Sequence, residues 1–175
     1  MFVGQRHSYK NFNLCLKLIS HHQKYNLLTV GGNQLDNNEM KLYNDFKNWH
    51  HLGFVSETEL NELYNNAFCL FYPSSYEGFG MPLIDAMKVG CPVIVNSTSS
   101  LIEIGSSYAI IVDVFDKKDL YSSIYKIEDK RKDKNFKSSL ISYAKNFTWV
   151  KSARLHQKVY QGFYQWNDES NQLGF

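Results

Sequence analysis

The apolar positions of the chain follow two alternating patterns. Short, almost continuous apolar runs such as 68–72 have the length and composition of buried strands. Between these runs, apolar residues return at helical spacing, as Phe12, Cys15 and Ile19 do. The predicted strands are 2–3, 26–30, 51–55, 68–72, 93–95 and 108–112, and the predicted helices are 12–24, 36–49, 57–67, 82–88, 116–127, 136–147 and 148–166. This alternation predicts an α/β fold, a doubly wound parallel sheet with helices on both of its faces.

One stretch, 73–87, joins a predicted buried strand to a predicted helix. Its two glycines, Gly78 and Gly80, let the backbone approach a ligand without a Cβ in the way. Pro82 suits the first turn of a helix, where a missing N–H has no cost. The free N–H groups at such a helix start attract phosphate or another anion. We therefore expect a ligand site at this junction.

Two carboxylates in this stretch have an informative spacing. Seven helical steps turn the chain by about 700°, so Gly78 and Asp85 share a face, and the rise over that span is about 10 Å. This is wider than the separation of about 5 to 9.5 Å at which two carboxyls act on one glycosidic bond. The spacing suits Glu77 and Asp85 holding the two ends of an extended, hydroxyl-rich ligand with phosphate between them.

A second glycine turn lies near the start of the chain. Gly4 follows the first strand, and Arg6 and Lys10 precede the first helix. Two cations beside a glycine turn at a helix N-terminus form a plausible diphosphate clamp. From the sequence pattern alone, solvated surface cations are the alternative interpretation.

Helix starts and metal-binding residue types add structural detail. The S-x-x-E sequences that begin at Ser56 and Ser100 predict two capping boxes. The adjacent pair His50 and His51 has no further ligand at metal-binding spacing, so we expect it at the exposed start of a strand. The cysteines lack Cys-x-x-Cys spacing and are interpreted as small buried hydrophobes in a reducing compartment; they are Cys15, Cys69 and Cys91.

The totals exclude several classes of partner. A chain of 175 residues is expected to form one domain with a substantial core. Its net charge of +2 is too small to imply nucleic acid or an anionic membrane surface. No apolar run approaches the ~20 residues of a membrane span, and no signal peptide is visible. We therefore expect a cytoplasmic protein with no transmembrane segment and no nucleic-acid partner.

The junction resembles the Glu-x7-Glu signature of the group 1 family of retaining nucleotide-sugar glycosyltransferases, which have the GT-B fold. The family pattern is roughly P-S-x-x-E-G-F-G-x-P-x-x-E-A-M-x-x-G-x-P-V-I, and 73–94 matches it at nearly every fixed position. The resemblance implies that Glu77 contacts the hydroxyls of the transferred sugar and that Asp85 contacts the ribose. Asp85 is one carbon–carbon bond, about 1.5 Å, shorter than the usual Glu, which predicts a weaker or water-bridged ribose contact. The turn that would bind sugar and diphosphate through backbone N–H groups consists of Gly78, Phe79, Gly80, Met81, Pro82 and Leu83.

Two other segments resemble the same family. Its first glycine turn carries an Arg and a Lys-Asn pair that bind the donor diphosphate, which implies this role for Gly4, Arg6 and Lys10 with Asn11. Its loop after the third strand lies beside the nucleobase. Phe54 and Val55 are therefore candidate base contacts, mainly through their backbone, or alternatively core residues.

The resemblance implies the C-terminal, donor-binding half of a larger enzyme. The expected organisation is a Rossmann-like domain with closing helices over 1–166 and a flexible tail over 167–175. The donor would be a UDP- or GDP-linked sugar, transferred with retention and without a metal or other cofactor. Both the N-terminal acceptor-binding domain and the acceptor, a lipid-linked glycan of surface polysaccharide assembly at the inner face of the membrane, would lie outside this chain. Asp85 leaves open an alternative, a non-catalytic module that binds nucleotide sugar and assists another subunit.

Overall fold

The structure is a computed structural model that describes residues 1–6 and 8–172. The chain divides into two compact units, Met1–Ala144 and Lys145–Phe175. The first unit contains all six strands and the hydrophobic core cluster. The second contains one long helix, α8 (Trp149–Gln172).

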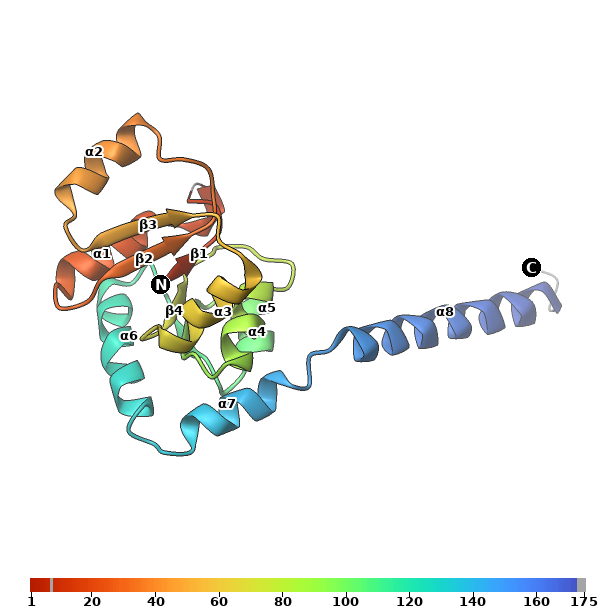
Figure 1. Cartoon of the computed structure of the whole chain (residues 1–175). Helices are drawn as coiled ribbons and strands as arrows, with labels where there is room; N and C mark the ends of the chain where they lie inside the picture. The colour runs from red at the N-terminus through yellow and green to blue at the C-terminus, as the bar shows by residue number, and fades with distance from the viewer. Residues whose placement is uncertain (7, 173–175) are drawn as a thin grey trace. The chain divides into compact units, whose positions relative to one another are not determined.

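All strand pairs in the first unit are parallel. The strands are β1 (Phe2–Val3), β2 (Leu27–Val30), β3 (Trp49–Gly53), β4 (Leu70–Tyr72), β5 (Val93–Asn96) and β6 (Ile110–Val112). They form two three-stranded halves, β1-β2-β3 and β4-β5-β6. The halves meet where the N-terminal ammonium of Met1 donates to the Cys69 carbonyl at 2.7 Å and the Phe71 N–H donates to the Met1 carbonyl at 2.9 Å. The resulting order 3-2-1-4-5-6 confirms the predicted doubly wound sheet (Figure 1).

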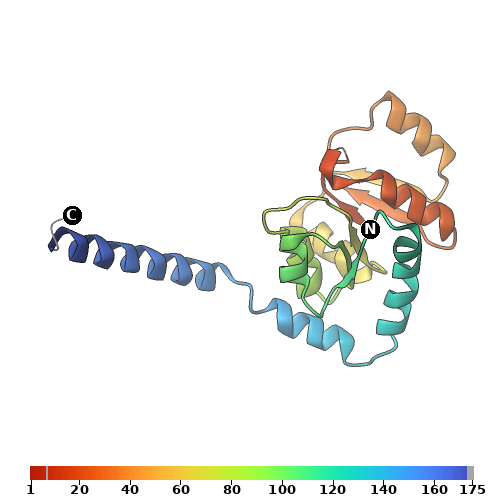
Figure 2. The same ribbon diagram turned by 180° about the vertical axis from the view of Figure 1, so that it is seen from behind.

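Helices cover both faces of the sheet. One face carries α1 (Asn13–His21) and α6 (Lys117–Lys130), which lie in front of the strands in Figure 2. The other carries α3 (Glu57–Asn66) and α4 (Met81–Lys88), and α7 (Phe136–Ala144) packs on α4. The remaining helices are η1 (Ser8–Lys10), α2 (Asn37–Asp45) and α5 (Ser99–Gly105). Because alternate residues of a strand face opposite sides, every residue of β4 and β5 is buried.

The third strand starts and ends earlier than expected. Trp49 is 1% exposed and packs on Phe12, with ring centroids 5.0 Å apart, so the strand begins there and not at His51. Gly53 ends it with a φ of +66°, which leaves Phe54 and Val55 in the following loop. The preceding helix, expected to reach 49, ends at Asp45 for the same reason.

One predicted capping box forms and the other does not. The Ser56 hydroxyl accepts from the Glu59 N–H, and the Glu59 carboxylate accepts from the Ser56 N–H at 2.8 Å. The box predicted at Ser100 was wrong, because Ser100 lies inside α5 and its hydroxyl donates to the Glu77 carbonyl at 2.6 Å. That bond fixes the junction loop and leaves the cap of α5 to Thr98, whose side chain makes no capping bond.

The C-terminal helix is longer than the sequence pattern indicates. It continues through 167–172, which were expected to form a flexible tail. Residues 173–175 of that predicted tail lie outside the described part of the chain. Among the described helices, none is both long enough and apolar enough to cross a bilayer.

Candidate functional site

Two loops meet where the direction of strand order reverses, between the carboxyl ends of β1 and β4. The Ser75 N–H donates to the Tyr9 carbonyl at 2.7 Å. The Asn11 side-chain amide donates to the Pro73 carbonyl at 2.9 Å and to the Ser75 hydroxyl at 2.6 Å. Ligands of doubly wound sheets bind in the crevice at this point. The two predicted site segments, after β1 and after β4, therefore lie next to each other, and the Asn11 side chain links them by hydrogen bonds.

A buried ion pair links the two loops. Lys10 Nζ donates to Glu77 Oε1 at 2.5 Å and to the Tyr72 hydroxyl at 2.8 Å. The Lys10 and Glu77 side chains are only 11% and 13% exposed. Burial and the neighbouring Glu77 carboxylate raise the pKa of Tyr72, so its hydroxyl stays neutral beside the pair. Gly4 lies next to this pair, because a Cβ there would be 3.8 Å from Lys10 Nζ.

The junction loop ends in the predicted helix start. Gly80 caps α4 with a left-handed φ of +96°, and Pro82 lies in the first turn. A Cβ at Gly78 would meet nothing within 4 Å, so the backbone there is open to a ligand. Phe79 and Met81 are 43% and 40% exposed. Leu83 is fully buried, so any ligand contact from Leu83 would come from its backbone.

The other predicted ligand residues lie at the edges of this site. Asp85 is on α4, with a side chain 38% exposed and 3.6 Å from Lys88 Nζ. Phe54 is 79% exposed in the loop after β3, which excludes a core role for its side chain. Val55, beside it, is half-buried.

Arg6 does not join Lys10 and Glu77. Its guanidinium forms a two-point ion pair with Glu39, Nε to Oε1 at 2.8 Å and Nη2 to Oε2 at 3.2 Å. It also donates to the carbonyls of Gly31 at 3.2 Å and Asn33 at 2.6 Å. The Arg6 side chain is 2% exposed. The structure thus places this predicted phosphate ligand inside the loop that follows β2.

Arg6 and Glu39 lie beside a pocket that is lined in part by Phe54, a predicted base contact. The pocket has a volume of about 830 Å³ and is formed by the loop after β2 and the end of β3. His51 lines it, half-buried within β3 and not at an exposed strand start as expected. The sequence indicated the β3 side of this pocket through Phe54 but missed the side formed by the loop after β2, for which the D-x-x-E spacing of the Asp36–Glu39 capping box was an available signal.

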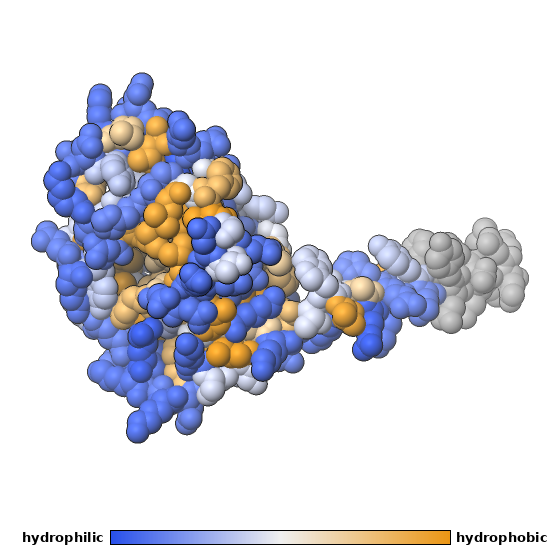
Figure 3. Space-filling model, viewed as in Figure 1, coloured by the Kyte–Doolittle hydropathy of each residue, from blue (hydrophilic) through white to orange (hydrophobic). Residues whose placement is uncertain are grey.

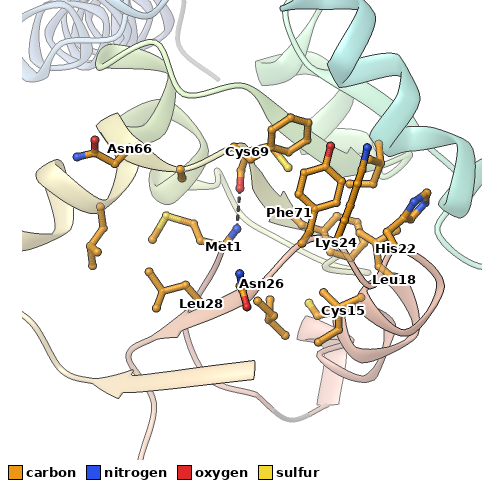
Figure 4. A pocket seen from close by; sticks show the side chains of 17 residues that line it. Met1, Cys15, Leu18, His22, Lys24, Asn26, Leu28, Asn66, Cys69 and Phe71 are labelled. Atoms are coloured by element: carbon orange, nitrogen blue, oxygen red, sulfur yellow. Dashed lines mark hydrogen bonds between the residues drawn. The ribbon is translucent and has the colours of Figure 1, made fainter. Parts of the chain in front are cut away.

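A second pocket lies at the opposite, amino end of the strands (Figure 4). Its volume is about 380 Å³, and its lining includes Met1, Leu28 and Cys69. Burial raises the pKa of both Cys15 and Cys69 in this wall, so the thiols stay protonated. Figure 3 shows apolar residues gathered in the middle of the face seen in Figure 1, surrounded by polar ones.

The cysteines are buried, and the described residues contain no cluster suited to a metal ion. The three cysteines are free and buried, as predicted, and burial raises the pKa of Cys91 to about 12. Within residues 1–6 and 8–172 no cluster of three or more His, Cys, Asp or Glu could hold a metal ion.

A family model and individual relatives of known name point to the same protein family. Residues 1–147 match the model of the family described as "Glycosyl transferases group 1". The chain is 32% identical over 100 residues to O-antigen chain mannosyltransferase B of Escherichia coli, covering 57% of this chain and 26% of that protein. It is 43% identical over 74 residues to O-antigen chain mannosyltransferase RfbU of Salmonella typhimurium, covering 42% and 21%.

The fold agrees with solved structures. The crystal structure of a glycosyltransferase from Rickettsia africae superimposes with a TM-score of 0.77 at 15% identity. The match covers 92% of this chain and 47% of that one, and it supports assignment of the fold to the Rossmann-like C-terminal half of a GT-B protein. The chain spans about a quarter of the length of the curated relatives it matches.

Proposed function

Because the chain belongs to the group 1 glycosyl transferases, we propose that it binds the activated-sugar donor of such an enzyme. The observation that carries the proposal is the Lys10–Glu77 ion pair at the crevice between the β1 and β4 loops. A cation for phosphate and a carboxylate for sugar hydroxyls stand there side by side. The ligand class is a nucleoside diphosphate sugar, linked to UDP or GDP.

The donor would replace the internal ion pair by two ligand contacts. Its diphosphate oxygens would accept hydrogen bonds from the Lys10 ammonium and from the N–H groups at the start of α4, where the helix dipole favours negative charge. The sugar hydroxyls would donate to Glu77, so that neither buried charge is left without a partner. The turn from Gly78 would bring backbone N–H groups close to the phosphates. The Gly4 N–H donates to the Val30 carbonyl, so Gly4 would contribute only room for a close approach of the ligand.

The remaining donor would extend to either side of the diphosphate. Asp85 would accept from the ribose hydroxyls, and Phe54 with Val55 would border the base. The exposed position of Phe54 after β3 supports a ligand contact there.

The reaction class follows from where charge develops. As the bond from sugar to nucleoside diphosphate breaks, negative charge grows on the leaving phosphate. Lys10 and the α4 N-terminus would stabilise that charge without a metal ion. We propose transfer with retention of configuration, with an acceptor held mainly by an N-terminal domain outside this chain. The names of the bacterial relatives favour mannose as the sugar and an O-antigen chain as the product. We further propose a lipid-linked glycan as the acceptor, at the cytoplasmic face of the membrane.

Calorimetric titration with UDP, GDP and their sugar conjugates, in EDTA, tests the proposal. We expect one nucleotide series to bind without metal and Lys10→Ala to weaken every member of that series. Glu77→Ala should weaken the sugar conjugate more than the free nucleotide, since its carboxylate is assigned to the sugar. Absence of binding by the wild-type chain, or equal binding of conjugate and nucleotide in all variants, would contradict the proposal.

A further inference from the structure

We propose that Arg6 is a positioning residue and does not itself bind the donor diphosphate. It shapes the pocket between the loop after β2 and the end of β3, where the base of the proposed donor would lie. The inference rests on the proposed donor site and assigns a role within it. The wall concerned is formed by Gly32–Leu35 and Met40, from the loop after β2 and from α2.

All three nitrogens of the Arg6 guanidinium donate to partners inside the protein. Nε donates to Glu39, and Nη2 donates to Glu39 and to the Asn33 carbonyl. Nη1 donates to the Gly31 carbonyl and lies 3.5 Å from His51 Nε2. A guanidinium has five N–H donors and no acceptor, and these hydrogen bonds occupy four of the five, while the remaining one faces His51.

The loop after β2 also closes sterically over Arg6. Gly31 and Gly32 both have left-handed backbone, with φ of +79° and +77°. A Cβ at Gly32 would lie 2.8 Å from Arg6 Nη1, so only glycine allows the loop to approach this closely. A phosphate would have to displace this backbone to reach the guanidinium.

The charge of Arg6 is neutralised by a carboxylate with a structural task of its own. Burial raises the pKa of Glu39, but hydrogen bonds from Arg6 and from the Asp36 N–H outweigh it and leave the pKa lowered. Glu39 is therefore ionised, and it completes the capping box of α2 by accepting from the Asp36 N–H at 3.0 Å. At Glu77, a hydroxyl of the donor could replace Lys10 as the hydrogen-bond partner. At Glu39, replacing Arg6 in the same way would disturb the N-terminus of α2, because Glu39 also accepts from the Asp36 N–H there.

The attachment matters most for the first turn of α2. The helix contains no buried residue, and its ring contact with the core, Tyr43 against Trp49 at 5.2 Å, lies a turn further on, so the Arg6–Glu39 pair is a principal tie of the first turn to the sheet. The same pair fixes Asn33 and Gln34, whose carbonyls accept from Arg6 and which line the pocket. Loss of Arg6 should therefore loosen the wall against which a base would pack.

The test compares a nucleoside with its diphosphate on the same protein preparation. Affinities of GDP and guanosine, and of UDP and uridine, are measured for the wild-type chain, Arg6→Gln, Glu39→Gln and the double variant. Positioning predicts that each single variant weakens nucleoside and nucleoside diphosphate alike, by about tenfold. The double variant should lose little more than either single variant, because both remove the same attachment.

The direct-contact alternative makes opposite predictions. If Arg6 bound the diphosphate, Arg6→Gln would weaken GDP or UDP and leave the nucleoside unchanged. Glu39→Gln would then free the guanidinium and tighten the nucleoside diphosphate. Either result overturns the inference, and the ratio of the two affinities is insensitive to a partly unfolded preparation.

A matched control separates this effect from a general loss of an ion pair. Glu128→Gln removes the carboxylate that pairs with Lys24 Nζ at 2.7 Å. Lys24 lines the amino-end pocket, at the opposite end of the strands from the proposed site. It should leave every affinity unchanged. If the wild-type chain binds neither nucleoside nor diphosphate, the proposed function itself fails, which distinguishes that outcome from a failure of the Arg6 assignment.

Discussion

At the scale of single residues, the site is built on one buried ion pair. Lys10 and Glu77 lie 67 positions apart in the chain and satisfy each other with Tyr72 as a third partner. Such a pair contributes little net stability, but removal of one member leaves an uncompensated buried charge. The residues that would bind the donor are therefore also the ones that hold the β1 and β4 loops together.

This arrangement predicts how stability responds to substitution. Lys10→Met should lower the free energy of unfolding by about 2 kcal/mol, because the Glu77 carboxylate loses its partner. Adding Glu77→Gln should recover part of the loss. Urea denaturation measures both, with Lys24→Met as a control, since the 64%-exposed Lys24 should change stability by only about 0.5 kcal/mol. A double variant as unstable as Lys10→Met would contradict this explanation.

His51 gives the pocket wall a pH dependence. Burial and the Arg6 guanidinium lower the pKa of His51, while the Glu39 carboxylate opposes the shift. The unfolded chain thus binds the His51 proton more tightly, so this contribution to stability is present above about pH 6.5 and is lost as the pH falls through the folded pKa.

We expect wild-type stability to fall more steeply than that of His51→Gln when the pH is lowered from about 7.5 to 5.5. Thermal unfolding monitored by circular dichroism at each pH measures the difference. Parallel pH curves for the two proteins would show that His51 does not couple to this network. The lowered pKa of Glu39 acts in a separate, more acidic window, below about pH 4.3.

Residue chemistry identified candidate site residues only where their position did not depend on a side chain distant in the sequence. Glu77, Lys10 and the glycines were identifiable because their spacing from strand ends sets their location. The same argument placed Arg6 with the phosphate, since a sequence window shows the cation but not Glu39, which lies 33 positions away. Long-range saturation of a side chain is a property of tertiary packing, and periodicity contains no information on it.

At the scale of elements, two glycines of one turn have different tasks. Gly80 caps α4 in left-handed backbone, and a Cβ there would lie 3.0 Å from Leu101 Cδ2. Gly80→Ala should therefore destabilise the protein by about 1–2 kcal/mol through backbone strain. Gly78→Ala is the matched control: its Cβ meets nothing, so stability should be nearly unchanged while nucleotide affinity falls.

Urea denaturation and nucleotide titration of both glycine variants distinguish these tasks. Equal losses of stability would argue against the strain at Gly80. Unchanged nucleotide affinity in Gly78→Ala would argue against a close approach of ligand to that backbone.

Element boundaries show a similar limit of the sequence. The alternation of patterns predicted all six strands, but the third was placed two residues too late. The pair His50 and His51 reads as polar, whereas Trp49 begins the strand because it fills the core against Phe12. Which of two neighbouring residues enters the core depends on the partner helix, and that partner is not visible in a local pattern.

At the scale of the whole molecule, topology concentrates function at one place. The order 3-2-1-4-5-6 brings the loops after β1 and β4 together at the carboxyl edge, and the sequence predicted this edge from the position of its motifs. The amino-end pocket lies at the other edge and has an apolar lining with protonated thiols. We therefore place the proposed nucleotide at the carboxyl edge alone.

Hydrogen–deuterium exchange with saturating UDP or GDP tests this central assignment most directly. Binding at the crevice should slow exchange in 4–11 and 73–85, and less strongly in the pocket segments 32–35 and 51–54. Exchange around Cys15 and Cys69 should not change. Protection confined to the amino-end pocket, or no protection by either nucleotide, would contradict the account.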